Sequence, residues 1–265
     1  MGIVLKIANL IAFFFLLSVN VYSGLAPVKD SPYSHITYIS PASFTFYVWF
    51  LIHLLLVGFV IYQFFTEDDD IINKGIHWHF VGVALLNALW LALWDDDLLF
   101  LSWIVILIIA CQVTYIYHEI YFHYFPFDHF SWRYTFIYLP FTLYHAWIVV
   151  VAVLTTFAAI TPEKTYSTTG HSETETASSP NIIVQLVVII GLLFFESTAV
   201  AYIEARQDYA GGAVIAWTLY GVWHEQEDPV IHWSALILAI IATIYLFKPL
   251  VAKLFGRESK RDSVV

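Results

Sequence analysis

The sequence predicts an all-α protein, a polytopic integral membrane bundle of about eight transmembrane helices. Hydrophobic residues make up 60% of its 265 residues and charged residues only 12%, whereas a soluble domain is about half apolar and a quarter charged. The apolar residues also gather in runs close to the roughly 20 residues that a helix needs to cross a bilayer. These runs lack the polar and apolar alternation of transmembrane strands, so helices are the predicted elements.

Eight apolar runs are expected to form the helices. The seventh run is short for a full crossing, so a tilted or re-entrant path is an alternative for it. The first run begins near Lys6 and could also be a signal peptide, but its length favours a retained helix. The predicted helices cover residues 3–24, 42–65, 77–94, 98–117, 132–160, 183–205, 209–223 and 229–250.

Polar segments divide the chain into four parts. Five predicted helices occupy residues 1–160, a polar low-complexity loop follows at 161–182, three helices occupy 183–250, and a charged tail covers 251–265. Basic residues favour the cytoplasmic side of a membrane, so the C-terminus is expected there, and eight crossings return the N-terminus to the same side. The basic residues near this end are Lys248, Lys253, Arg257, Lys260 and Arg261.

We expect the short acidic runs and the scattered histidines to have structural roles and not to bind metal ions. The acidic runs at 67–70 and 95–97 are expected to be solvated helix ends, with Asp97 offsetting the dipole of the fourth helix. His118 and His123 stand five residues apart instead of the four of a zinc-protease helix, so no metal site is expected.

Composition also narrows the classes of function. The single cysteine, Cys111, excludes a disulfide framework and a cysteine-based zinc site. The net charge of -10 argues against nucleic acid as a partner. Because the chain carries no glycine-rich phosphate loop, nucleotide fingerprint or Ser-His-Asp order, we expect no catalytic residue and no enzymatic activity.

Three of the predicted helices carry a stripe of aromatic and polar residues along one face. Asparagine and histidine are costly in lipid, so these stripes should face the interior of the bundle. Together they could line a small-molecule pocket, or they could simply pack the helices, with Asn87 as an interhelical hydrogen-bond link. The stripes are Phe46, Trp49 and His53; Asn87, Trp90 and Trp94; and Pro140, Tyr144 and Trp147.

The same stripes contain motifs that resemble those of the tryptophan-rich sensory protein / translocator protein family, once named for the peripheral benzodiazepine receptor. Residues 41–49 (PASFTFYVW) resemble its Pro-x-x-aromatic-x-Phe-x-x-Trp signature. Residues 86–90 (LNALW) resemble its third-helix Leu-Asn-x-x-Trp, and residues 139–147 (LPFTLYHAW) its fifth-helix Leu-Pro-(Tyr/Phe)…Trp. The resemblance covers residues 1–160, and the last three predicted helices resemble the C-terminal extension of longer relatives.

The resemblance implies a five-helix bundle whose pocket opens near the loop after the first helix and binds a planar hydrophobic ligand. Haem, porphyrins and sterols are the ligand classes it implies, haem or porphyrin being a ligand rather than a required cofactor. The implied partners are the lipid bilayer and a second copy of the chain, because family members are often dimers. Combined with the stripes, it gives a ligand-binding set of Trp49, His53, Asn87, Trp90, Tyr144 and Trp147, with Pro41, Phe46 and Pro140 shaping the pocket.

This chain departs from the family pattern in three places, which leaves the ligand open. The family usually has tyrosine at the position of His53, and the asparagine expected late in the fifth helix is replaced by Thr155 or Thr156. The glycine that follows the proline in short family members is replaced within Ala42-Ser43. His53 and His145 lie within predicted helices and could act as haem ligands or in a proton relay. Hydrogen bonding to a neighbouring helix is favoured for both, because no second ligand follows four residues later.

Glu196 supports a different function. It is the only carboxylate deep within a predicted helix, where a charge is costly unless it is paired or protonated. It could therefore couple a proton to transport in a secondary transporter, or it could be a protonated side chain bonded to a neighbouring hydroxyl or amide. A structural scaffold without any ligand is the remaining alternative.

Overall fold

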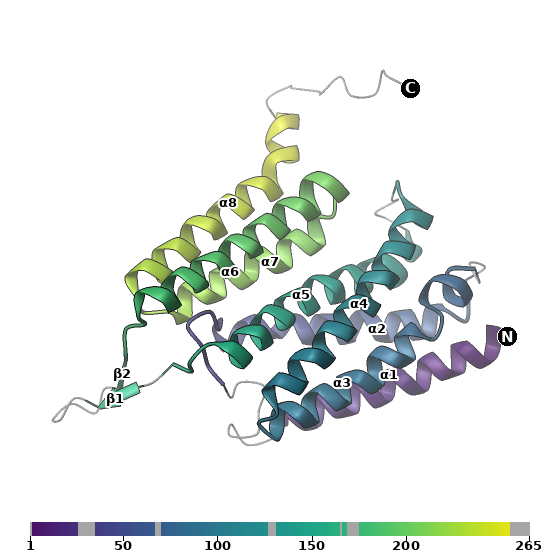
Figure 1. The fold of residues 1–265 in the computed structure, drawn as a ribbon. Helices are drawn as coiled ribbons and strands as arrows, with labels where there is room; N and C mark the ends of the chain where they lie inside the picture. Colours follow the sequence, from purple (N-terminus) through teal and green to yellow (C-terminus); the bar gives the residue numbers. More distant parts are fainter. Residues whose placement is uncertain are drawn as a thin grey trace.

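The computed structural model describes residues 2–25, 35–66, 70–126, 131–164, 166–168 and 175–254 (Figure 1). The acidic residues 67–69 and the tail from residue 255 onward, including Arg257, Lys260 and Arg261, lie outside the described residues. Within the described segments, the α-helices are α1 (Gly2–Leu25), α2 (Tyr47–Tyr62), α3 (His79–Asp95), α4 (Leu99–Tyr124), α5 (Leu139–Ile160), α6 (Ile182–Val200), α7 (Tyr209–Glu225) and α8 (Pro229–Leu254).

Short helical turns of other types adjoin several of these helices. A 3-10 turn, η2 (Ser43–Phe46), leads into α2. Wider π-helical turns, η4 (Tyr134–Tyr138) and η5 (Ala201–Ala205), extend α5 at its start and α6 at its end. A further π-helical turn, η3 (Ile71–Ile76), precedes α3.

The all-α membrane class is confirmed, but fewer helices than predicted are full membrane spans by length and hydropathy. Six stretches in the described part of the chain meet both criteria. The two other helices, α3 and α7, have 17 residues each, and a crossing needs about 20. The six stretches are Gly2–Leu25, Ser43–Tyr62, Leu99–His123, Tyr134–Ile160, Ile182–Ala205 and Pro229–Pro249.

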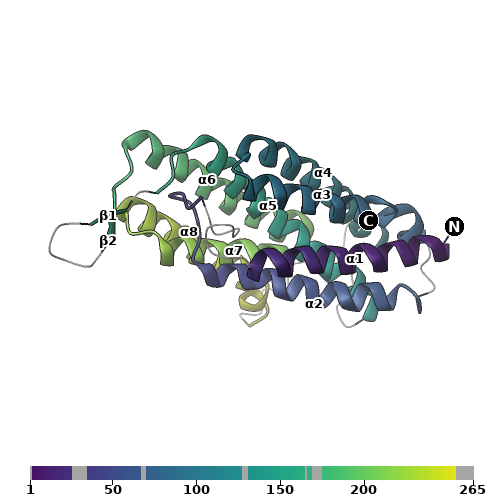
Figure 2. The ribbon, with the colours of Figure 1, turned by 90° about the horizontal axis from the view of Figure 1, so that it is seen from below.

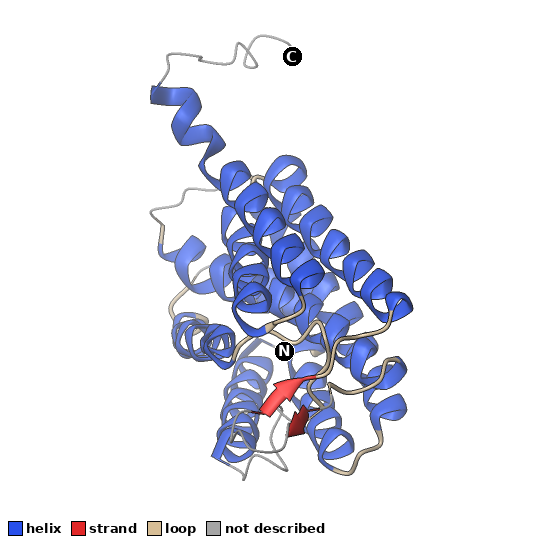
Figure 3. Ribbon diagram, turned by 90° about the vertical axis from the view of Figure 1, so that its left-hand side faces the viewer, coloured by secondary structure: helices blue, strands red, loops and turns tan. Residues whose placement is uncertain are grey.

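The polar segment between α5 and α6 contains structure that its composition does not predict. Two short strands, β1 (Tyr166–Thr168) and β2 (Glu175–Ala177), pair antiparallel as a small hairpin (Figure 3). The hairpin lies at one end of the molecule (Figure 1). Threonine and tyrosine suit an extended backbone, which is a weak signal beside the low complexity of residues 161–182.

The first five helices pack in a closed ring. Helix α1 packs against α2 and α3, α5 packs against α2 and α4, and α3 packs against α4 (Figure 2). Helices α6, α7 and α8 each pack against the other two, and α7 connects this trio to the ring through α5 (Figure 1). The inward faces of both groups carry the buried apolar core.

A segment before α2 also joins the ring to the trio. The Gln226 side-chain amide at the end of α7 donates to the carbonyl oxygens of Ser40 (2.7 Å) and Thr37 (3.3 Å). The Ala42 backbone N–H donates to the carbonyl oxygen of Gly221 in α7 at 3.0 Å. These bonds fix the chain that enters α2, and therefore the position of the aromatic residues that follow it.

Candidate ligand-binding cavity in the five-helix ring

A cavity of about 260 Å³ lies inside the ring, between α1, α2, α3 and α5. It sits where α1, α3 and α5 end and α2 begins, which is the end of the ring closest to the hairpin (Figure 1). This is the position that the family resemblance implies for a pocket opening. Its aromatic lining is Phe46, Trp49, Phe50, Trp90 and Trp94.

A connected group of rings places these aromatic side chains. Trp49 lies 5.2 Å from His53, 5.5 Å from Tyr144 and 6.3 Å from Trp147, between ring centroids. Tyr144 and Trp147 are fully buried and do not line the cavity. They instead support Trp49 from behind, as edge-to-face and tilted aromatic pairs do.

The interior of the ring contains an unusual number of unpaired polar atoms. Buried polar groups in proteins are nearly always hydrogen-bonded, and an unpaired one costs about 1–3 kcal/mol. Asn87 is 1% exposed, yet neither side-chain atom has a partner among the described residues, so the interhelical link that packing would require is not formed. In and directly behind the wall of the cavity, the atoms concerned are Ser23 Oγ, His53 Nε2, Asn87 Nδ2 and Oδ1, Trp90 Nε1, Trp94 Nε1, Tyr144 OH, Trp147 Nε1 and Thr155 Oγ1.

The hydrogen bonding of His53 defines what this side chain can offer to a ligand. Its Nδ1 lies 2.7 Å from the carbonyl oxygen of Trp49. A carbonyl oxygen can only accept, so Nδ1 carries the proton and Nε2 of the neutral ring is an acceptor. Because His53 lines the cavity, this acceptor complements the indole N–H donors of Trp90 and Trp94.

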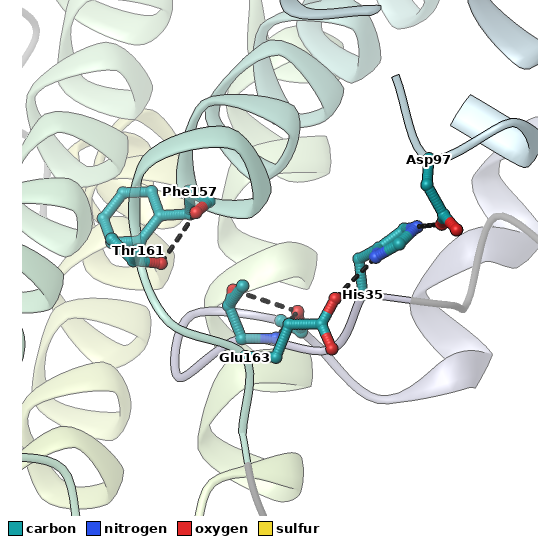
Figure 4. Close-up of polar contacts among 7 residues, drawn as sticks. His35, Asp97, Phe157, Thr161 and Glu163 are labelled. Atoms are coloured by element: carbon teal, nitrogen blue, oxygen red, sulfur yellow. Dashed lines mark hydrogen bonds and ion pairs between the residues drawn. The ribbon is translucent and has the colours of Figure 1, made fainter. Parts of the chain in front are cut away.

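A histidine packs behind Trp94, one of the residues that line the cavity. His35 Nδ1 contacts Glu163 Oε1 at 2.6 Å and His35 Nε2 contacts Asp97 Oδ1 at 3.1 Å (Figure 4). The His35 ring also packs edge-on against Trp94, with 5.1 Å between centroids. These residues come from the segments before α2, between α3 and α4, and after α5, so one imidazole ties together three connections beside the cavity.

This pairing changes the expected role of Asp97. The acidic run predicts a solvated helix end in which Asp97 offsets the dipole of α4. In the structure Leu98 is the residue that precedes α4, and it makes no side-chain cap. Asp97 adopts a positive φ of 59° and pairs with His35 instead.

Most of the predicted site residues lie in the wall of the cavity or directly behind it, and the others, described next, lie elsewhere. Phe46, Trp49, His53 and Trp90 line the cavity. Asn87, Tyr144 and Trp147 lie in the buried layer behind it.

Two prolines and two titratable residues lie elsewhere. Pro41 lies beside Gly221 of α7. Pro140 is in the first turn of α5, about 16 Å along the helix from the cavity residue Val151 by the rise per residue. His145 bonds Thr114 of α4 and Tyr202 of η5. Glu196 is buried on α6, and neither carboxylate oxygen has a hydrogen-bond partner among the described residues.

Several cavity residues are absent from the set that the sequence predicts. Trp94 belongs to the same stripe as Trp90 and could have been included on that signal. Asn20 and Ser23 of α1 also line the cavity, and their polarity at the end of an apolar helix was the available signal. His35 has no such signal, because its partners lie in distant connections.

In the described part of the chain, no group of three or more His, Cys, Asp or Glu side chains could hold a metal ion.

Comparison with known protein families gives one match. A family model described as TSPO-like protein matches residues 6–248. The match therefore extends beyond the five-helix ring through α6, α7 and most of α8. No curated protein and no solved structure matches the chain.

Proposed function

The chain belongs to the TSPO-like protein family, and we propose that it is a multi-pass membrane receptor or carrier that binds a flat hydrophobic ligand inside the ring formed by residues 1–160. One observation carries this proposal. Five residues in the wall of a cavity with an aromatic lining each have a buried polar atom without a partner among the described residues, namely Ser23, His53, Trp90, Trp94 and Thr155. A ligand with a flat apolar face and a polar edge would satisfy both features at once.

Different side chains would contact different parts of the ligand. Trp49 and Trp90 would contact the flat face of the ligand, and His53 would orient its polar edge. Asn87, which lies behind the wall, would bond a ligand edge that inserts past the wall into the buried layer. The cavity volume of about 260 Å³ lies just below the ~300–1,000 Å³ of most small-molecule pockets. A tetrapyrrole or sterol, the classes that the resemblance implies, would therefore insert one edge instead of being enclosed completely.

Replacing Asn87 by leucine tests this function against a packing role. Asn87→Leu removes two unpaired buried polar atoms at similar volume, so thermal stability should rise. If the amide binds ligand, affinity for protoporphyrin or a sterol should fall by about tenfold, the value of one good hydrogen bond. Both quantities can be measured on the purified full chain, with protoporphyrin absorbance and a labelled sterol as the readouts.

Asn9→Leu is the matched control. Asn9 is also a buried asparagine of the ring, but its side-chain amide donates to Gln63 at 3.2 Å. This change should lower stability and leave ligand affinity unchanged. If the wild-type chain binds neither probe, or if Asn87→Leu binds as well as wild type, the scaffold alternative is the better account.

A second candidate function rests on Glu196. A buried carboxylate without hydrogen-bond partners in a membrane helix is stable only when protonated or when a cation enters. Glu196 would then couple a proton to ligand movement. Glu196→Gln should abolish pH-driven flux of labelled ligand into proteoliposomes without changing binding. Glu204→Gln, which alters an exposed ion pair with Lys248, is the control, and equal flux from both variants would exclude coupling through Glu196.

A further inference from the structure

A second cavity lies between α4, α5 and the end of α6. Its volume is about 230 Å³, and it shares no lining residue with the ring cavity. Arg206, which follows η5, forms part of its wall together with His118, His145 and Tyr202. The cavity is therefore near the end of the molecule where α1 begins and α8 ends, whereas the ring cavity is near the hairpin (Figure 1).

Arg206 is held in place by aromatic rings and keeps an unpaired donor. Its guanidinium carbon lies 4.5 Å from the ring centroid of Tyr121 and 5.9 and 5.5 Å from those of Tyr117 and Phe122. Its Nη1 atom is buried and has no hydrogen-bond partner among the described residues. A buried guanidinium donor without a partner is costly, and a bound anion would remove that cost.

The nearest carboxylates are engaged elsewhere. Asp208 accepts hydrogen bonds from the Tyr117 hydroxyl (2.8 Å) and from the backbone of α7 (2.9 Å). Glu204 pairs with Lys248 at 2.6 Å. No acidic side chain lines the cavity in the described part of the chain. Arg206 therefore gives the cavity a positive charge that no ion pair within the described residues neutralises.

The other polar wall of the cavity is rigid and already satisfied. His145 bonds to the Tyr202 hydroxyl through Nδ1 and to Thr114 Oγ1 through Nε2, the latter at 3.0 Å. Its ring stacks on Tyr117, with 4.5 Å between centroids and an interplanar angle of 6°. Since these groups already have partners and His118 of the same wall is exposed, Arg206 is the lining residue that keeps a buried donor without a partner among the described residues.

Exposed apolar side chains of α4 and α6 adjoin the cavity on the side towards the middle of the bundle. Helices α4 and α6 run in the same direction, away from the hairpin end (Figure 1). Leu107 and Cys111 lie one to two turns before the cavity residue Thr114 on α4, and Ile190 and Phe194 hold the matching places before Thr198 on α6. Leu107, Ile190 and Phe194 are 39%, 66% and 50% exposed. An acyl chain between these two helices would cover this apolar surface.

We propose that this cavity binds an anionic phospholipid, with its phosphate against the Arg206 guanidinium and one acyl chain along the exposed apolar side chains of α4 and α6. The planar fork of arginine is well suited to phosphate oxygens. The charge selects an anionic head group, and the adjoining apolar side chains select a molecule that carries a hydrocarbon chain. This site is independent of the proposed ligand of the ring.

Native mass spectrometry of the full chain tests the site. The protein is presented with equal amounts of phosphatidylglycerol and phosphatidylcholine, and phosphatidylglycerol should be retained preferentially. Arg206→Gln should weaken its binding by about tenfold or more, as expected for the loss of a charged hydrogen bond. Ala205→Phe should also weaken binding, because the ring fills the cavity without changing the charge.

Controls separate this site from general attraction to charge. Lys248→Gln removes a positive charge at the same end of the molecule and should not change the preference. If Arg206→Gln does not fold, two other variants still test lipid binding at this site. They are Arg206→Lys, which keeps the charge, and Ala205→Phe. Equal retention of the two lipids, or retention unaffected by both Arg206→Lys and Ala205→Phe, would overturn the proposal. Displacement of the lipid by equimolar inorganic phosphate or oleate would show a small-anion or fatty-acid site instead.

Discussion

A single glycine allows the segment before α2 to approach α7. A Cβ atom at Gly221 would collide with Thr45 Oγ1 and would lie 3.0 Å from Pro41 Cβ. The carbonyl oxygen of the same glycine accepts the hydrogen bond from Ala42. Because Phe46 and Trp49 follow this segment, one missing side chain helps to place the aromatic wall of the ring cavity.

Gly221→Ala is expected to destabilise the protein and to weaken ligand binding. The added methyl group must push back Thr45, which is fully buried, and such overpacking typically costs about 1–3 kcal/mol. Thermal unfolding and a protoporphyrin titration measure the two effects. Gly24→Ala is the control for stability, because nothing lies within 4 Å of the Cβ position at Gly24. Equal melting temperatures for the two variants would contradict the close approach.

At the scale of elements, two polar side chains hold helices together where apolar packing alone would leave their order open. His35 joins three connections beside the ring cavity. Asp208, which is 2% exposed, caps α7 and accepts hydrogen bonds from Tyr117 of α4 and Thr142 of α5. Neither side chain lines the ring cavity, but each restricts how the helices around it can move.

Replacing His35 should loosen the connections beside the cavity. Both imidazole nitrogens contact carboxylates, and a glutamine side chain at this position could bond only one of the two partners. His35→Gln should therefore speed ligand dissociation several-fold. Stopped-flow release of protoporphyrin measures this effect. His123→Gln, at the other end of the molecule, should behave as wild type, and identical release from His35→Gln would exclude this role.

The Asp208 junction should contribute strongly to stability. Asp208→Ala removes an N-cap, worth about 1 kcal/mol, and leaves two buried hydroxyl groups unpaired, each costing about 1–3 kcal/mol. We expect a loss of about 3 kcal/mol in the free energy of unfolding, measured by denaturation in mixed micelles. Asp208→Asn keeps the cap and should lose less. The exposed Asp96, replaced by alanine, should have little effect, and a similarly small effect for Asp208→Ala would refute the junction.

At the scale of the whole molecule, the even number of α-helices from α1 to α8 brings the start of α1 and the end of α8 to the same end of the bundle. The hairpin lies at the opposite end (Figures 1 and 2). By the positive-inside rule, the basic residues near the end of α8 predict that this side faces the cytoplasm. The ring cavity would then open towards the opposite side of the membrane, and the Arg206 cavity would lie in the cytoplasmic leaflet.

Protease protection in oriented vesicles tests this topology. Tags placed before α1 and after α8 should both be cleaved from the cytoplasmic side. A protease site inserted among residues 169–174 should be cleaved only from the other side. Tags on opposite sides would mean that an odd number of helices crosses the membrane, and the 17-residue α3 and α7 would be the first helices to reconsider.

Parts of the site could be predicted because they depend on one helix at a time. Trp49 and His53 on α2, and Asn87 and Trp90 on α3, are spaced to share a face, and the resemblance to the family assigned these faces to a pocket. The family match confirms that resemblance. Pro140 shows the limit of this reasoning, because it shares the Trp147 stripe but lies about three turns from the cavity residue Val151. A stripe predicts a direction from the helix axis, not a depth along it.

The sequence alone determined that this chain is a helical membrane protein, because apolar runs without alternation leave only helices able to satisfy their backbone in lipid. On α2, α3 and α5 it also predicted an inward face, from the spacing of aromatic and polar residues. The tertiary structure alone decided the ring order of α1 to α5, the contact of His35 with Asp97 and Glu163, and the cavity at Arg206. These features join residues that are far apart in the chain, and local hydrophobicity and helical spacing carry no information about which helix becomes the neighbour of which.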